Sequence, residues 1–192
     1  DKFKDRGVTS VFGKIEAGTI KLGDKIVIMP NKQEAEVVGL KYHDDFIEMA
    51  KAGDNVQVLL KNIEENDVQT GHMICDPKDP VPVVKEFLGQ FLVLNKPLFA
   101  AGYSAVMHVH VACEVVTIVD FVAKVDKKTG QQVQGAKPKV GQTGDSLIAK
   151  FELEKAICLE KFEVNQHLGR FTIRESSGTC MLGKILKIKP LK

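Results

Sequence analysis

A short pattern recurs along the chain, in which a glycine, usually followed by aspartate, stands directly before an apolar run. The clearest copies are residues 22–28, 52–58 and 143–149, and a looser copy is residues 101–107. Glycine adopts a positive φ without a steric cost, so each copy is typical of a turn that leads into a strand. The copies are irregularly spaced, which argues against a solenoid of equal repeats and favours similar hairpins within barrels.

Most other segments also have the residue pattern of strands. Residues 8–15, 34–42, 86–94 and 181–188 are β-branched or alternate in polarity, with glycine or proline nearby. The longest such run is 104–125, whose odd-numbered apolar residues we expect to face a core: Met107, Val109, Val111, Cys113, Val115, Val119 and Phe121. Helical periodicity is absent apart from a short helical turn expected at residues 64–67. Many short strands with Gly/Pro turns predict an all-β fold of barrels or sandwiches.

A proline-rich segment divides the chain near residue 80. Pro77, Pro80 and Pro82 cannot lie in a central strand and favour an extended, rather stiff connector. The charge changes sign at the same place: residues 1–82 hold 11 Lys/Arg against 15 Asp/Glu (−4), and residues 83–192 hold 16 against 10 (+6). We therefore expect two domains, residues 1–80 and 81–192, with different partners.

Composition narrows the class of protein. The chain is 44% hydrophobic and 27% charged, an ordinary globular mixture, and no run of eighteen apolar residues predicts a membrane span. Its four cysteines form no CxxC pair and lie in apolar stretches, so we expect reduced, small hydrophobic side chains in a cytoplasmic protein. Because it begins at Asp1 and enters a strand at once, we expect a piece of a longer protein.

No catalytic or nucleotide-binding motif is found. The sequence has no GxSxG, HExxH or GxxxxGK[ST] segment, and residues 95–98 (NKPL) lack the acidic residue of a guanine-reading NKxD element. The acidic pairs Asp44-Asp45 and Glu64-Glu65 have the pattern of solvated loop carboxylates. We expect no catalytic residues, no nucleotide-binding residues and no cofactor bound by this chain.

Two groups of side chains have both a structural and a functional interpretation. His108 and His110 would share one strand face and could chelate zinc, but no third ligand is evident, so we expect structural or interface histidines and no metal site. Five lysines lie near one loop, which is modest for phosphate binding and more typical of a solvated hairpin tip; they are Lys124, Lys127, Lys128, Lys137 and Lys139. We expect neither direct DNA binding nor a membrane partner.

The most informative stretch is Gly169-Arg170-Phe171-Thr172-Ile173-Arg174-Glu175. As a strand, it would point Phe171 and Ile173 inward and place Arg170, Thr172 and Arg174 on the outer face. Two guanidinium groups that flank a hydroxyl are suited to carboxylates or backbone carbonyls of a partner. The residues alone leave two interpretations open, an ordinary strand or a partner-binding site.

At this point the sequence resembles a known family. Residues 125–130 (VDKKTG), 169–175 (GRFTIRE) and 183–185 resemble the last domain of eukaryotic translation GTPases, and residues 13–18, 23–24, 52–56 and 71–77 resemble their second domain. The resemblance covers essentially the whole chain in the right order. The GRFT core, the VDKKTG turn and Cys75-Asp76-Pro77 are most similar to the class II release factor, although Glu175 replaces the usual final aspartate.

The resemblance implies two six-stranded antiparallel β-barrels of the translation-GTPase type and a role in translation termination. GTP and Mg²⁺ would be bound by a GTPase domain outside this chain. The second barrel would bind the C-terminal domain of the class I release factor through Gly169 to Glu175, with Phe121 as a further contact. The acidic first barrel would pack on the GTPase domain and face the small ribosomal subunit.

Two other branches of the family remain open. In one, the barrels bind aminoacyl-tRNA, as in an elongation factor, whose corresponding segment would typically read GRFAVRD. In the other, the chain belongs to a ribosome-rescue GTPase, whose partner is a paralogue of the release factor. Both alternatives keep the same fold.

Overall fold

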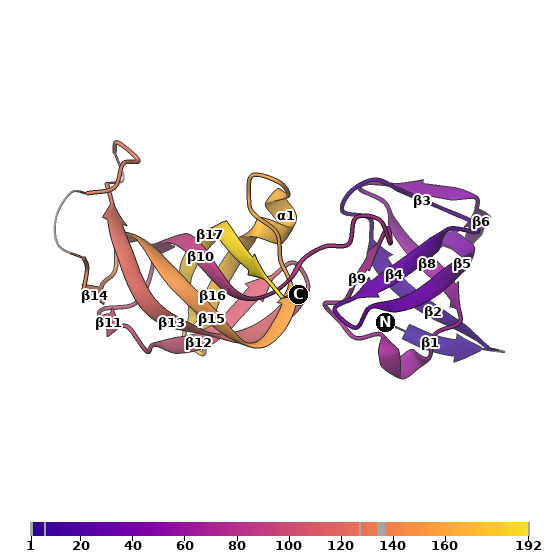
Figure 1. Cartoon of the computed structure of the whole chain (residues 1–192), viewed down its shortest axis with the longest axis horizontal. Helices are drawn as coiled ribbons and strands as arrows, with labels where there is room; N and C mark the ends of the chain where they lie inside the picture. Colours follow the sequence, from indigo (N-terminus) through magenta and orange to yellow (C-terminus); the bar gives the residue numbers. More distant parts are fainter. Residues whose placement is uncertain (1, 6, 127, 134–136, 192) are drawn as a thin grey trace. The chain divides into compact units, whose positions relative to one another are not determined.

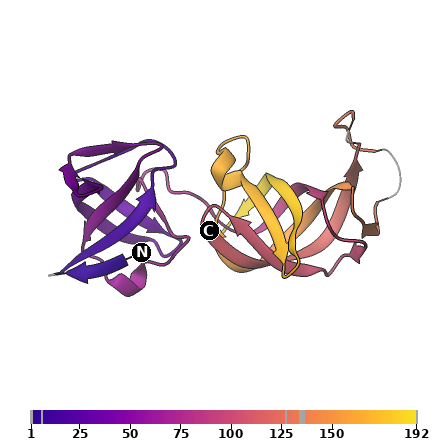
Figure 2. The ribbon, with the colours of Figure 1, turned by 180° about the vertical axis from the view of Figure 1, so that it is seen from behind.

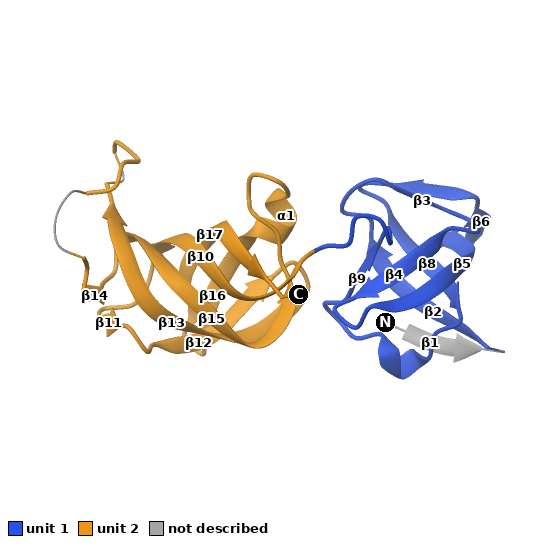
Figure 3. Ribbon diagram, in the orientation of Figure 1, with its two compact units in different colours: residues 1–81 blue, residues 82–192 orange. Residues whose placement is uncertain are grey.

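The structure is a computed structural model that describes residues 2–5, 7–126, 128–133 and 137–191. It divides into two compact units, Asp1–Val81 and Pro82–Lys192 (Figure 3). The regular structure of the described residues is almost entirely β-strand, with two short helical turns, η1 (Glu65–Asp67) and α1 (Gln166–Gly169). The predicted all-β fold is therefore confirmed, and η1 lies where the short helical turn was expected.

The first unit is built on one sheet of seven strands. Its strands are β1 (Lys2–Asp5), β2 (Val8–Lys14), β3 (Thr19–Lys21), β4 (Lys25–Met29), β5 (Gln33–Tyr42), β6 (Asp45–Ile47), β7 (Met49–Lys51), β8 (Asn55–Lys61) and β9 (Met73–Cys75). The main sheet has the order β1-β2-β8-β5-β4-β9, and β6 pairs with β5. Strands β3 and β7 form a separate two-stranded ribbon, so the strand count differs from the six that were expected.

The recurrent glycine–aspartate pattern forms the same turn in both units. Gly23, Gly53 and Gly144 have φ of +85°, +102° and +91°, and they precede β4, β8 and β15 (Ser146–Cys158). In each turn the following aspartate accepts a hydrogen bond from a backbone N–H three residues earlier; Asp24 Oδ2, for example, accepts from Lys21 N at 2.8 Å. The pattern therefore fixes where these strands begin, as the sequence predicted.

The second unit contains a closed antiparallel barrel of six strands. Its strands are β10 (Val83–Val93), β12 (Ser104–Val109), β13 (Ala112–Val125), β15, β16 (Arg170–Glu175) and β17 (Gly178–Pro190), in the closed order β10-β15-β13-β12-β16-β17 (Figures 1 and 2). A separate ribbon pairs β11 (Phe99–Ala100) with β14 (Val140–Gly141). Closure leaves no free edge strand in the barrel, which protects it from edge-to-edge pairing.

The core of this barrel is dominated by phenylalanine rings. Phe87 stacks on Phe151 with ring centroids 5.0 Å apart, and Phe171 meets both rings edge-on at 5.6 and 5.5 Å. Such offset and edge-to-face pairs add to the stabilisation that burial alone gives. The first unit has its own aliphatic core, which includes Ile28, Leu40 and Leu60.

The run at residues 104–125 is a hairpin rather than one strand. Strands β12 and β13 are joined by a turn at His110 and Val111, with His110 at φ +42°. Met107, Val109 and Phe121 are buried as predicted. The prediction was wrong for four odd-numbered residues that are exposed: Val111, Cys113, Val115 and Val119.

The turn explains this difference. Val109 pairs with Ala112, so the core-facing positions change from odd to even after the turn, and Val116 and Ile118 are buried. A register shift between Ile118 and Asp120 on β13 then returns Phe121 to the core. A bulge adds one residue to one strand and thereby reverses the alternation of faces.

Candidate protein-binding face

Strand β16 lies between β12 and β17 in the barrel and contains the segment that the sequence singled out. Its buried and exposed residues alternate: Phe171 and Ile173 are buried, Arg170 and Arg174 are exposed, and Thr172 is half-buried. The predicted division of this segment into an inner and an outer face is confirmed.

The start of β16 is positioned by helix α1. Asn165 Oδ1 caps the helix by accepting hydrogen bonds from the backbone N–H groups of His167 (2.9 Å) and Leu168 (3.1 Å). Gly169 then passes so close to the chain at Phe162 that a Cβ would lie 2.4 Å from the Phe162 Cα. Only glycine fits this approach, so Gly169 acts by positioning the strand.

The apolar residues predicted for the partner site are core residues. Phe171 and Ile173 are 0% and 1% exposed, and Phe121 is 1% exposed against Phe99. The ring of Phe171 occupies space left by two glycines, because a Cβ on Gly183 would lie 2.3 Å and one on Gly89 3.1 Å from it. These side chains hold the barrel together and present no surface to a partner.

The outer side chains of β16 belong to a wider surface that includes both neighbouring strands. Across β16, Thr172 pairs with His108 on β12 and with Leu182 on β17. Arg174 pairs with Val106, and Arg170 with Lys184. Residues directly opposite each other project from the same face of a sheet. We call this surface the β16 face, made up of Arg170, Thr172, Arg174, Val106, His108, Leu182 and Lys184.

The β16 face combines cationic and exposed apolar groups. Val106 is 39% and Leu182 44% exposed, so each leaves apolar surface in water beside a guanidinium group. Such a mixture is typical of protein-binding surfaces, where arginine supplies planar hydrogen bonding and apolar side chains supply buried area. Chemically, this face is suited to a partner surface that carries carboxylates next to apolar side chains.

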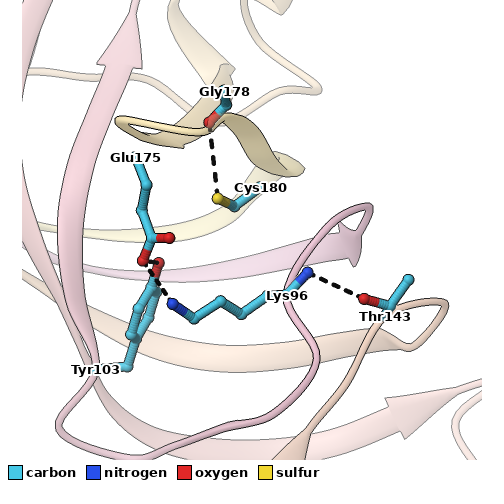
Figure 4. Close-up of polar contacts among 6 residues, drawn as sticks. All are labelled: Lys96, Tyr103, Thr143, Glu175, Gly178 and Cys180. Atoms are coloured by element: carbon cyan, nitrogen blue, oxygen red, sulfur yellow. Dashed lines mark hydrogen bonds and ion pairs between the residues drawn. The ribbon is translucent and has the colours of Figure 1, made fainter.

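Glu175, the last predicted contact residue, is bound within its own barrel. Its Oε1 accepts hydrogen bonds from the Lys96 ammonium at 2.7 Å and from the Tyr103 hydroxyl at 2.6 Å (Figure 4). The Lys96 ammonium also lies 4.8 Å from the centroid of the Tyr103 ring, and the Lys96 backbone N–H donates to Thr143. The network joins the end of β16 to Lys96, which lies before β11, and to Tyr103, which lies between β11 and β12.

These contacts shift the acidity of three groups. The hydrogen bonds from Lys96 and then Tyr103 lower the pKa of the Glu175 carboxyl. Burial, followed by the hydrogen bond to Glu175, raises the pKa of the Tyr103 hydroxyl, and burial also raises the pKa of the nearby Cys180 thiol. Both shifts in the Glu175–Tyr103 pair favour a charged carboxylate that faces a neutral phenol.

The two histidines that the sequence placed on one strand face contact different groups. His108 Nδ1 lies 3.0 Å from Cys113 Sγ, whereas His110, in the turn, has its Nε2 3.1 Å from the Cys158 carbonyl oxygen. Within the described residues, no three His, Cys, Asp or Glu side chains gather as a metal site would require. In the same part of the chain, no helix is long and apolar enough to cross a membrane.

Two family models match the chain. Residues 86–186 match the model described as "GTP-eEF1A C-terminal domain-like", and residues 9–75 match "Elongation factor Tu domain 2". The first match covers more than half of the chain. The chain belongs to the translation GTPase family. Its two units correspond to the second and the C-terminal β domains of that family, so the resemblance drawn from the GRFT segment is confirmed.

Individual translation GTPases show the same relationship. The GTP-binding subunit of the eukaryotic peptide chain release factor from Dictyostelium discoideum is 38% identical over 97% of this chain, and elongation factor 1-alpha from Saccharolobus solfataricus is 34% identical over 100%. The solved structure of sup35 complexed with GDP matches 98% of the chain with a TM-score of 0.91 and 36% identity. The chain spans 34%, 44% and 46% of these three proteins.

Sequence reasoning missed the network around Glu175. Lys96 was considered only as part of a nucleotide-binding motif, and Tyr103 only as part of a turn. Lys96 and Tyr103 are separated from Glu175 by 79 and 72 positions, so no local pattern could have joined them. The one residue of the network that the sequence singled out is Glu175, the acidic residue that ends the GRFTIRE segment.

Proposed function

We propose that this translation GTPase chain carries a class I release factor in translation termination. The β16 face would bind the C-terminal domain of that factor, the protein that reads stop codons and triggers peptide release. GTP hydrolysis would take place in a GTPase domain of the same protein. The carried factor could then be repositioned when that domain changes state.

The observation that carries this proposal is the composition of the β16 face. Arg170 and Arg174 are both exposed, stand on either side of Thr172 and lie next to exposed apolar side chains. Similarity to release-factor GTP-binding subunits, at 34–38% identity, supports a protein partner of the termination type. Direct contacts are assigned to Arg170, Thr172 and Arg174, while Gly169, Phe171, Ile173 and Glu175 hold the strand in place.

The first unit has a separate proposed role. Its segment 1–82 carries a net charge of −4, opposite in sign to that of the second unit, which favours a different partner. We assign it to packing against the GTPase domain and to the side that faces the small ribosomal subunit. Such a protein would work in the cytoplasm, with its cysteines reduced.

Calorimetry tests the main proposal directly. The purified chain is titrated with the C-terminal domain of the class I release factor, and the wild type is compared with the Arg170→Ala plus Arg174→Ala variant. Exposed cations at an interface typically contribute a few kcal/mol when they are paired, so we expect affinity to fall by about tenfold or more. A matched control is Lys150→Ala plus Lys155→Ala, which removes the same charge from β15 on another part of the barrel.

The control should bind like the wild type. Equal affinity for the wild type and the arginine variant, with normal circular dichroism in both, would remove the β16 face from the interface. Failure of the wild-type chain to bind the release factor at all would overturn the proposal itself.

A tRNA-binding role is the alternative that the elongation-factor relatives support. The salt dependence of affinity distinguishes tRNA binding from release-factor binding, because tRNA affinity would fall steeply as salt rises through counterion release. A packed protein interface responds less, mainly through the association rate. The third alternative is a ribosome-rescue GTPase. It is distinguished by letting the class I release factor and its ribosome-rescue paralogue compete for binding to this chain.

A further inference from the structure

A thiol and an imidazole meet on the outer surface of the second barrel. Cys113 on β13 and His108 on β12 are directly opposite each other in the hairpin, and Cys113 Sγ lies 3.0 Å from His108 Nδ1. Cys113 is exposed, whereas His108 is half-buried. A cysteine beside a histidine that can accept its proton is the arrangement that activates thiols as nucleophiles.

Cys113 differs in this respect from the other three cysteines. Cys75 is 8% exposed, and Cys158 and Cys180 are 0% exposed. Burial also raises the pKa of the Cys75 and Cys180 thiols, which keeps them protonated and unreactive. Cys113 therefore stands alone among the four cysteines in combining access from solvent with an imidazole partner.

We propose that Cys113 is a site of reversible modification by anionic low-molecular-weight disulfides such as glutathione disulfide, with His108 as the base. The Cys113 proton passes to His108 Nδ1, and the thiolate attacks one sulfur of the small disulfide. A new Sγ–S bond forms while the S–S bond of the reagent breaks. The released thiolate takes the proton from His108, so one small thiol leaves for each mixed disulfide formed.

The positive charge of strand β16 favours an anionic reagent. Strand β16 lies two strands from β13, roughly 10 Å away, and carries Arg170 and Arg174 on its exposed face. This separation is close to the screening length at physiological salt, so the guanidinium groups attract an anion to the Cys113 side of the barrel. The reaction needs no protein partner, so it is independent of release-factor binding.

The test measures the rate at which glutathione disulfide modifies the whole chain at neutral pH, by intact mass and peptide mapping. The first adduct should form on Cys113, and Cys113→Ser should abolish it. His108→Gln should react about tenfold more slowly, since it loses the base. His43→Gln makes the same change in the other unit and should react like the wild type. Circular dichroism confirms that each variant is folded.

A second pair of reagents tests the role of charge. Arg174→Ala should slow modification by glutathione disulfide by about threefold, and leave modification by the neutral hydroxyethyl disulfide unchanged. A first adduct on Cys75, Cys158 or Cys180 would overturn the proposal. So would equal rates for the wild type and a folded His108→Gln variant. Equal slowing of both reagents by Arg174→Ala would overturn the preference for an anion.

Discussion

Glu175 Oε1 accepts a hydrogen bond from the Tyr103 hydroxyl, with 2.6 Å between the two oxygens and 72 positions of sequence between the two residues. The same oxygen accepts a hydrogen bond from Lys96, whose side chain is 24% exposed. The end of β16 is therefore anchored to the residues on either side of β11. Because Arg174 is the next residue along the strand, this anchor also fixes one edge of the β16 face.

Tyr103→Phe tests the anchor while keeping the ring. The variant loses a hydrogen bond to a charged acceptor, so we expect the free energy of unfolding to fall by about 1–2 kcal/mol. Urea unfolding followed by circular dichroism measures the change. Tyr42→Phe, which alters an exposed tyrosine of the first unit, is the matched control and should change stability little. Equal effects of the two substitutions would show that the Tyr103 hydroxyl contributes nothing specific.

The stability that Glu175 contributes should depend on pH. Its pKa is lowered in the folded state by Lys96 and Tyr103, so the folded protein holds the proton less tightly than the unfolded chain. The contribution is therefore fully present above the ordinary glutamate value of 4.5 and is lost as the pH falls through the lower folded value. Unfolding free energies of the wild type and Glu175→Gln should differ most at neutral pH and converge in acid. A constant difference across this range would contradict the assignment.

The alternation along β16 and the starts of β4, β8 and β15 could be predicted because local chemistry determines them. Alternating side chains and a glycine before an aspartate act within a few residues. The exposure of Val119 and Cys113 could not be predicted, since the face on which each side chain lies depends on the turn at His110 and on register shifts set by the neighbouring strands.

In the candidate site, too, some features could be predicted from the local sequence and others could not. Arg170, Thr172 and Arg174 were identified correctly as an outer stripe from their spacing alone. Their neighbours Val106 and Leu182 come from other strands, and only the register places them on the same face. The role of Gly169 as a close-packing residue was equally hidden, because it depends on how near the chain at Phe162 approaches.

Gly183→Ala tests the packing beneath the β16 face. The new methyl group would lie 2.3 Å from the Phe171 ring, which itself packs against Phe87 and Phe151 and cannot retreat freely. Overpacking of this kind typically costs about 1–3 kcal/mol of stability. Gly13→Ala is the matched control, because a Cβ there meets nothing within 4 Å. In the Gly183→Ala background, Phe171→Leu should cost less than it does alone; additive costs would show that the two sites do not interact.

Leu182→Ser tests whether the apolar part of the β16 face contributes to partner binding. Leu182 is 44% exposed and lies directly opposite Thr172, so the substitution removes a partly buried side chain and should lower the free energy of unfolding by about 1 kcal/mol, with the chain still folded. If a partner covers this side chain, most of its remaining apolar surface becomes buried on binding, which is typically worth about 1–2 kcal/mol, or roughly tenfold in affinity. Calorimetry with the class I release factor measures the loss, and Leu22→Ser, the same change at an exposed leucine of the first unit, should leave affinity unchanged. A loss shared equally by both variants would mean that surface apolarity in general, rather than the β16 face, promotes association. A loss confined to Leu182→Ser, together with a loss in the arginine variant, would place the cationic and apolar groups in one interface.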